Sequence, residues 1–395
     1  MKKLLLTFIL FFSFLFACTS AVISGKATPD GRPLLWKHRD TGNLENKLVH
    51  VRTPAYDFTG VVNANDSLNR EIWMGVNEKG FAIMNTASYN INEDVSADLG
   101  EDQEGLFMRE ALEKCADMED FEQLLKASSG EWGIAANFGV IDAAGNAAYF
   151  ETGYYDHRKY DANDPEAAPE GYLIRTNFSF SGGSEEGVGY IRYEATRELF
   201  KAQTSFTPEF LIREATRNLD HGALKTHIGN MRLPRHAGDR TLAGFQDYIP
   251  RYWSASVLVV QGVRPDEDPQ NSLLWPVMGF PLTAMATPVC FRSADRLPEV
   301  ISSEEEVPFM TVSSLGLKSH LFPREHDDHE NYIDVARLKN RRKQGYLQII
   351  MKKEKAILDR FEKIKHSRDP GEIHAYYEWV DDYVCEVYEK ILLKR

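Results

Sequence analysis

The stretch CTSAVISGKATPDGRPLLWKHRD, residues 18–40, contains two β-type runs separated by a turn. CTSAVISG and RPLLWKHRD flank the segment KATPDG, whose Pro29, Asp30 and Gly31 are turn formers. The sequence therefore predicts a hairpin that begins immediately at Cys18. This residue also ends an apolar leader, so it could anchor a lipid, pack in the core or become the first residue of a mature chain.

The leader itself has the features of a signal peptide over residues 1–17. Lys2 and Lys3 supply a positive start, and Leu4 to Phe16 supply an apolar run that ends at Ala17. A membrane span needs about 20 apolar residues, and no later segment approaches that length. We therefore expect an exported protein, periplasmic or secreted, without an integral membrane span.

A second interpretation of the leader is a lipobox, formed by residues 15–18, in which Cys18 would be lipidated. Phe16 fits that motif poorly, since small or β-branched residues are usual there. Thr19 also leads directly into a β-type run, whereas a lipoprotein cysteine is normally followed by a flexible polar tether. These features favour signal peptidase cleavage and leave lipid anchoring through Cys18 as the alternative.

Composition excludes several classes of protein. Hydrophobic residues make up 43% of the 395 residues and charged residues 27%, which is enough for a sizeable core. The formal net charge of −13 argues against a nucleic-acid partner. The chain has 4 cysteines and no CxxC pair, so neither a disulfide scaffold nor a structural zinc site is expected. No motif requires a metal or organic cofactor.

The order of the elements indicates α+β architecture with antiparallel sheets. Further hairpins are predicted over 72–89 and 132–153, a helix over Leu106–Lys126, and strands over 171–180, 253–263 and 273–289. Helices are expected from Arg192 to about Leu219, with Thr207 as an N-cap. From about Ile301 the composition changes to charged amphipathic helices. We expect a main domain over 18–300 and a helical extension over 301–395 packed on it.

Five motifs occur in an order that resembles a known superfamily: CTSAV…DGRPLLWKHRD, GVNEKGFAIMN, GVIDAAGNAAYFETG, RTNFSF and YIRYEATREL. They resemble the linear-amide C–N hydrolases, N-terminal-nucleophile enzymes that include choloylglycine hydrolases, penicillin V acylases, acid-ceramidase-like amidases and the isopenicillin N acyltransferases of peptidase family C45. The resemblance covers about Cys18 to about Arg292. It implies a four-layer αββα sandwich and a thiol nucleophile at Cys18.

An N-terminal cysteine can supply both the nucleophile and its base. A free thiol has a pKa of about 8.5, and a free α-amine with a pKa of about 8 can take its proton. This chemistry requires cleavage between Ala17 and Cys18. We expect that leader removal, rather than self-cleavage of an internal propeptide, exposes the nucleophile.

The resemblance also implies roles for two positions near the end of the first hairpin. Asp40 would orient the α-amine, and either Lys37 or Arg39 would stabilise the thiolate. The superfamily usually has asparagine where His38 stands and often has arginine where Lys37 stands, so both cations stay candidates. Without the resemblance these residues would be interpreted as solvated strand residues and a hairpin-end carboxylate.

Three further residues match supporting positions of the superfamily. Asn177 matches the asparagine that stabilises the oxyanion, and Arg192 matches a site-supporting arginine. Asn85 is the expected second contributor to the oxyanion site, through its backbone or its side chain, with Asn90 as its rival. The alternatives are turn asparagines and a helix-capping arginine. The resemblance implies an exported amidase that cleaves a small-molecule N-acyl amide through a thioester. An acyltransferase and a non-enzymatic Cys18 lipoprotein are the alternatives, and homo-oligomerisation through the helical extension is left open.

Overall fold

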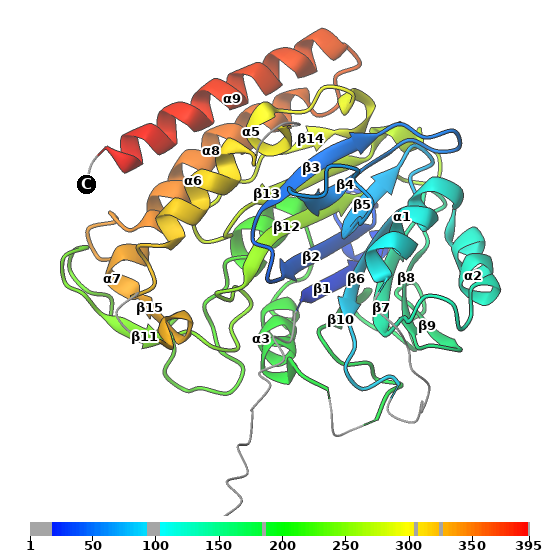
Figure 1. Ribbon diagram of the computed structural model, residues 1–395, viewed down its shortest axis with the longest axis horizontal. Coiled ribbons are helices and arrows are strands. Elements are labelled where there is room, and N and C mark those ends of the chain that lie inside the picture. The colour runs from blue at the N-terminus through cyan, green and yellow to red at the C-terminus, as the bar shows by residue number, and fades with distance from the viewer. Residues whose placement is uncertain (1–17, 93–102, 184–186, 304–306, 324–326, 394–395) are drawn as a thin grey trace, which may run out of the picture.

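The computed structural model describes residues 18–92, 103–183, 187–303, 307–323 and 327–393. The predicted signal peptide over 1–17 lies outside these residues. Two antiparallel sheets face each other, and helices cover the outer face of each sheet (Figure 1). The predicted hairpin at Cys18 forms the centre of one of these sheets.

The first sheet, called sheet A, contains the hairpin and the strongly apolar strands from the second half of the main domain. Its pairings are all antiparallel. In spatial order its strands are β10 (Tyr172–Arg175), β1 (Thr19–Ile23), β2 (Leu34–Asp40), β12 (Ser254–Gln261), β13 (Leu273–Met278) and β14 (Val289–Cys290).

The second sheet, called sheet B, is an antiparallel meander in which every strand pairs with its neighbours in sequence. The predicted hairpins over 72–89 and 132–153 form part of it, whereas β3 and β4 were not anticipated. Its strands are β3 (Asn46–Val51), β4 (Phe58–Asn63), β5 (Met74–Asn77), β6 (Ala82–Ala87), β7 (Ala136–Ile141), β8 (Ala147–Thr152) and β9 (His157–Asp161).

The two sheets approach closely where β1 and β2 lie against β6, β7 and β8. Gly139 on β7 shows how close: a Cβ atom there would lie 2.9 Å from Val22 on β1 and 2.6 Å from Met84 on β6. The absence of a side chain at this position therefore lets the sheets meet. The interior between them contains no room for an ordinary side chain at Gly139.

Sheet B is covered by α1 (Glu104–Lys114) and α2 (Met118–Ala127), which bury phenylalanines against it. The single helix predicted over Leu106–Lys126 is wrong in one respect, because the chain breaks at Cys115. Asp117 caps α2 by accepting from the backbone N–H groups of Glu119 and Asp120, which starts a new helix. Cys115 itself is buried in the core beneath sheet B.

Sheet A is covered by helices from the middle and the end of the chain. These are α3 (Tyr190–Lys201), α4 (Pro208–Phe210) with a π-helical turn over Leu211–Ala215, α6 (Phe309–Lys318), α8 (Tyr346–Ile364) and α9 (Pro370–Leu392). Of the two short helices, α5 (Glu299–Ser302) contacts β3 and α9, and α7 (Val335–Leu338) contacts β15 and α8. Apolar residues of α8 and α9 share one core cluster with β2, β12 and β13. Thr207 caps α4 as predicted.

The C-terminal helices are held to the rest of the chain by more than apolar contacts. Arg217 donates to both carboxylate oxygens of Glu354 on α8, at 2.8 and 2.5 Å, and both side chains are buried. A short sheet joins β11 (Leu242–Gly244) to β15 (Tyr332–Asp334). No helix in the described ranges has both the length and the apolar character that a membrane crossing needs.

Helix, sheet, sheet and helix therefore stack as four layers. This confirms the expected α+β fold with antiparallel sheets and the αββα arrangement that the resemblance implied. The boundary at residue 300 stays a prediction. What the fold provides is one strand, β2, with sheet B on one side and helices on the other.

Candidate active site

Strand β2 ends in a run of polar residues, Lys37 to Asp40, all of them nearly completely buried. Successive side chains of a strand point to opposite faces. Lys37 and Arg39 therefore share the inner face, toward sheet B, where Lys37 Nζ donates to the Trp73 carbonyl at 2.8 Å. His38 and Asp40 share the outer face, toward the helices.

Cys18 directly precedes β1 and is 8% exposed. Ser20 lies opposite Lys37 in the β1–β2 ladder, and its hydroxyl lies 2.7 Å from the Tyr149 hydroxyl on sheet B. The strand alternation therefore carries the Cys18 side chain onto the same inner face. Continuing the register by one pair places Cys18 opposite Arg39.

Arg192, on the first turn of α3, fixes the backbone at Cys18. Its Nη1 donates to the Cys18 carbonyl at 2.6 Å and to the Thr19 hydroxyl at 2.7 Å, while its Nη2 donates to Asn177 Oδ1 at 2.8 Å. Burial lowers the pKa of Arg192 to about 10, so it is still a cation at neutral pH. One guanidinium thus joins Cys18 to Asn177, two residues that are far apart in sequence.

Gly189 is needed for this contact. It precedes α3 with a φ of +90°, a conformation that residues with a Cβ rarely adopt. A Cβ there would lie 2.5 Å from Arg192 Nη2 and 2.9 Å from the Thr176 hydroxyl. The glycine therefore provides both the turn into the helix and the space for the guanidinium.

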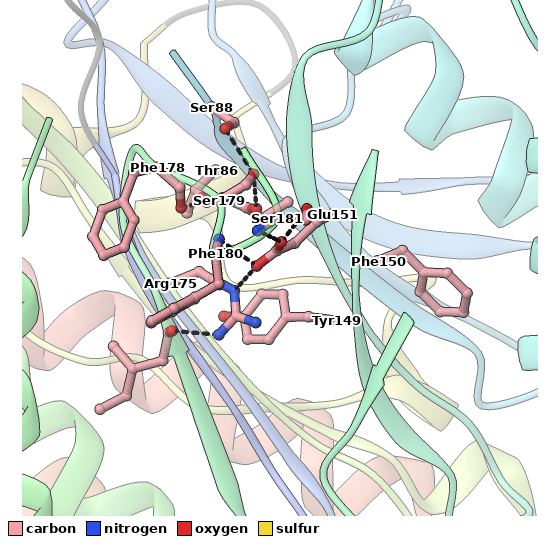
Figure 2. A network of polar contacts seen from close by, with 12 residues as sticks. Thr86, Ser88, Tyr149, Phe150, Glu151, Arg175, Phe178, Ser179, Phe180 and Ser181 are labelled. Atoms are coloured by element: carbon pink, nitrogen blue, oxygen red, sulfur yellow. Dashed lines mark hydrogen bonds and ion pairs between the residues drawn. The ribbon is translucent and has the colours of Figure 1, made fainter. Parts of the chain in front are cut away.

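The segment that follows Asn177 is held by a buried carboxylate, shown in Figure 2. Glu151 on β8 accepts from the backbone N–H groups of Phe180 and Ser181, at 2.9 and 2.7 Å, and from the Arg175 guanidinium at 2.7 Å. Arg175 and Glu151 are both buried. This network fixes the turn on the C-terminal side of Asn177 while Arg192 holds its side chain.

Asn90 fixes the same turn from the other side. Its Oδ1 accepts from the Ser179 backbone N–H at 2.8 Å, and its Nδ2 donates to the carbonyls of Ser179 and Gly183 at 3.1 and 2.6 Å. Both ends of the Asn90 amide are therefore used in hydrogen bonds that join its own loop to the loop of Ser179 and Gly183. This geometry favours a structural role for Asn90 over that of a second oxyanion donor.

Asn85 on β6 faces Lys37 across the gap between the sheets. Lys37 Nζ donates to Asn85 Oδ1 at 2.5 Å, and Asn85 Nδ2 donates to a carboxylate oxygen of Glu104 on α1. The Asn85 side chain thus forms hydrogen bonds to a buried cation on one side and to a buried carboxylate on the other. Its side chain is placed to position Lys37, and a contribution of Asn85 to the oxyanion site stays a prediction.

Burial strongly affects the two inner-face cations. Desolvation lowers the pKa of Lys37 to about 8 and that of Arg39 to about 10, with the charge of Cys18 the largest opposing influence on each. Arg39 donates to Asn46 Oδ1 at 2.7 Å and lies 4.5 Å from the centre of the Trp73 ring. Both cations therefore lie on the face that the Cys18 side chain occupies, and no carboxylate of the described residues forms an ion pair with either of them.

The outer face is organised around Asp40. Its Oδ1 accepts from the Ser254 hydroxyl at 2.6 Å, and its Oδ2 has no hydrogen-bond donor among the described residues. The nearest cation is Arg251, whose Nη1 lies 3.9 Å from Oδ2. His38 Nδ1 lies 3.4 Å from both Ser254 Oγ and Asp40 Oδ1.

The structure therefore brings all of the sequence-predicted site residues to one end of the sheet pair, on two sides of β2. It adds Ser254, Arg251 and Glu104, which sequence reasoning missed. Ser254 is the first residue of β12 and Arg251 lies shortly before that strand. Only the β2–β12 register reveals that Ser254 lies opposite Asp40. In the described part of the chain, no group of three or more His, Cys, Asp or Glu is placed to hold a metal ion.

Residues 45–206 match the family model described as Acyl-coenzyme A:6-aminopenicillanic acid acyl-transferase. The matched region includes Asn85, Asn177 and Arg192 and begins after Asp40. This match confirms the resemblance to the N-terminal-nucleophile linear-amide hydrolase superfamily that the five motifs indicated. Among proteins of curated function no match is found.

Three solved structures illustrate the similarity. An N-acylethanolamine-hydrolyzing acid amidase ortholog from Caenorhabditis elegans is 14% identical, with 64% of this chain and 95% of that chain covered and a TM-score of 0.40. Penicillin V acylase from Agrobacterium tumefaciens is 14% identical, with 73% and 88% covered and a TM-score of 0.39. A variant of conjugated bile acid hydrolase from Clostridium perfringens is 13% identical, with 70% and 93% covered and a TM-score of 0.35. Scores this low carry no argument about the site.

Proposed function

We propose that the protein is an exported amidase that cleaves the N-acyl bond of a small molecule, with Cys18 as an N-terminal nucleophile. The observation that carries this proposal is that Arg192 donates hydrogen bonds both to the Cys18 backbone and to the Asn177 side chain. A cysteine fixed in this way beside two buried cations has a reactive rather than a packing environment. Removal of residues 1–17 would free its α-amine.

In the proposed first step the Cys18 α-amine takes the proton from the thiol. Asp40 would accept a hydrogen bond from this amine through Oδ2, since Ser254 already occupies Oδ1. The register supports this role because Asp40 is one residue beyond Arg39, the position opposite Cys18. The carboxylate therefore orients the amine from the outer face while the sulfur points to the inner face.

The thiolate then attacks the amide carbon, and a C–S bond forms as the carbonyl oxygen becomes an oxyanion. Asn177, whose Nδ2 also donates to the Ala87 carbonyl at 2.9 Å, would stabilise that oxyanion. The positive charges of Lys37 and Arg39 would favour both anions on the inner face. Collapse of the intermediate breaks the C–N bond, and the α-ammonium returns the proton to the leaving amine. Water then hydrolyses the thioester and releases the acid.

The matched family gives one specific reason to keep a second function, because its description is that of an acyltransferase. In that case an amine, rather than water, would take the acyl group from the Cys18 thioester. The two reactions share every step up to the acyl-enzyme. They are distinguished by offering an acceptor amine and measuring transfer against hydrolysis.

The experiment that tests the proposed function begins with the mature N-terminus, determined by intact-mass spectrometry of protein recovered after export. The expected result is a chain that starts at Cys18 with an unmodified amine. That protein should form a covalent acyl adduct with an N-acyl substrate and turn it over. A diacylglyceryl adduct on Cys18 would contradict the proposal and indicate a surface lipoprotein.

A matched pair of variants makes the test specific. Cys18→Ala should abolish adduct formation and reduce turnover by about 10³-fold or more. Cys385→Ser removes the most exposed of the three remaining thiols and should leave adduct formation and turnover unchanged. Full activity in Cys18→Ala would instead indicate a different nucleophile.

A further inference from the structure

Lys318, at the end of α6, has a buried ammonium group that the chemistry proposed for Cys18 does not use. Its side chain is 4% exposed, and its Nζ has no hydrogen-bond partner among the residues that the structure describes. The Nζ lies 3.9 Å from the centre of the Tyr252 ring and 5.4 Å from that of Phe280. Burying an ammonium without a hydrogen-bond acceptor is costly, so a lysine is unexpected here unless it has a ligand.

The same lysine lines a cavity of about 170 Å³. The other walls include Leu44, Tyr252, Phe322 and His329, which combine an apolar surface with a polar edge. A space of this size can hold several water molecules or a small polar group. The lining therefore suits a compact charged end of a ligand whose remainder lies elsewhere.

This cavity adjoins the outer face of β2. Leu44 follows Asp40 closely in the chain, and Tyr252 follows Arg251, whose guanidinium approaches Asp40. Lys318 also interacts electrostatically with Asp40 and with Glu330. Neither carboxylate forms a hydrogen bond with the ammonium, so the two leave it available to a third group.

We propose, on the basis of the amidase chemistry proposed above, that this cavity binds a carboxylate carried by the substrate and that Lys318 recognises it. The substrate class is then an N-acyl compound with a free carboxylate. A charge-assisted hydrogen bond from a buried ammonium is among the stronger polar contacts available to a protein, which makes Lys318 a specificity-determining residue. The carboxylate can lie on the amine part or on the acyl part of the substrate.

Burial lowers the pKa of Lys318 to about 7, while Asp40 and Glu330 oppose that shift. The ammonium is therefore charged below pH 7 and increasingly neutral above it. Affinity for a carboxylate should fall as the pH rises from 6 to 9. The pH dependence of the parent protein is therefore compared with that of a Lys318 variant, in which this charge is absent.

The test uses binding to the Cys18→Ala protein, measured by isothermal titration calorimetry, so that turnover is not required. N-hexanoylglycine is compared with N-hexanoylglycinamide, which places the charge on the amine part. N-butyladipamic acid is compared with its neutral amide, which places the charge on the acyl part. We expect one of the two acids to bind about tenfold or more tightly than its neutral partner.

Lys318→Met, which keeps the length of the side chain and removes its charge, should abolish that preference and leave binding of the neutral partner unchanged. Lys355→Met removes an exposed lysine of α8 and should have no effect. Equal binding of acids and amides to the parent protein would overturn the inference, and so would a preference that survives in Lys318→Met.

These outcomes are separate from those that test the proposed function. If the processed Cys18 protein binds the acid preferentially but turns over no amide, the amidase proposal fails and the carboxylate site stands. If it turns over acid and amide equally, the amidase proposal stands and the carboxylate site fails. Circular dichroism of Lys318→Met confirms folding in either case.

Discussion

The two faces of β2 differ in how their buried charges are balanced. On the inner face, Lys37 and Arg39 meet carbonyl and amide oxygens and the Trp73 ring, and the nearest bonded carboxylate, Glu104, lies behind Asn85. On the outer face, Asp40 meets the Ser254 hydroxyl and the cation of Arg251. The inner face therefore has an excess of positive charge that favours an anion, whereas the outer face already contains the Asp40 carboxylate.

This difference suits a residue that must attack and accept a proton at once. A thiolate and an oxyanion would develop on the side with excess positive charge, and an ammonium would develop beside the carboxylate. A single strand separates the two because its side chains alternate. Substitutions that change one face and preserve the other should therefore separate the two tasks.

The largest effect is expected for Asp40→Asn. Asparagine keeps the shape and can still accept from the Ser254 hydroxyl, but it removes the charge that would orient the α-amine. We expect kcat/KM on an N-acyl substrate to fall about 10²- to 10⁴-fold, the range for loss of acid–base function. The melting temperature, followed by circular dichroism, should change little. Activity close to that of the parent protein would show that the outer face is not needed for proton transfer.

The next largest effect concerns stability, through the helices that pack on the outer face of sheet A. Glu354→Gln removes the charge from the buried ion pair with Arg217, and breaking such a pair costs about 3–5 kcal/mol. We expect the free energy of unfolding, measured by urea denaturation, to fall by that amount, with unchanged kcat at a temperature where the variant is folded. Asp359→Asn on the same helix breaks an exposed pair with Lys355 and should cost less than about 1 kcal/mol. Similar losses in the two variants would mean that the buried pair does not hold the helix layer.

A smaller effect concerns the pH dependence of the inner face. Because the pKa of Lys37 is lowered to about 8, its positive charge is lost as the pH rises through 8, and activity should fall there. Lys37→Arg should move this decline to higher pH, since a guanidinium keeps its proton. An unchanged decline in pH–rate profiles of the two proteins would exclude Lys37 as its cause.

The lowered pKa of Lys37 also predicts that stability rises over a pH range in which activity falls. Between about pH 8 and the ordinary lysine pKa of 10.5, the unfolded chain binds a proton at Lys37 that the folded chain does not. The free energy of unfolding should therefore rise with pH over this window. Lys37→Met lacks the titrating group, so its stability should rise less there.

Much of the fold could be predicted because it is local. The hairpin at Cys18, the turn in GVNEKGFAIMN and the apolar run of β12 each follow from residues close in sequence. The break at Cys115 was missed because the apolar spacing continues through it, and only the capping carboxylate of Asp117 marks a new start. The strands β3 and β4 were not anticipated, although Thr53, Pro54 and Asp57 are turn formers between them.

The site was only partly predictable, for a geometric reason. The four consecutive polar residues Lys37 to Asp40 indicate a polar site. The sequence does not predict that their side chains lie on two faces of the strand and have different partners. Ser254 and Arg251 approach Asp40 through the position of β12 and of the residues just before it, and Lys318 interacts with Asp40 through the packing of α6. No local pattern in the sequence marks these three residues. Asn85 and Asn90 look alike in sequence, yet one bonds to Lys37 and the other joins two loops.

The smallest effect is expected for His38→Asn, which also sharpens the comparison. His38 shares the outer face with Asp40, but its Nδ1 lies at 3.4 Å from its nearest partners and its Nε2 has none among the described residues. Such a weak contact should contribute little, so kcat/KM should stay within about tenfold of the parent value. The free energy of unfolding should fall by about 1 kcal/mol, as is typical of buried substitutions. A loss of activity as large as that of Asp40→Asn would show that the histidine and the carboxylate act together, and the outer face would then carry a proton relay rather than a single orienting charge.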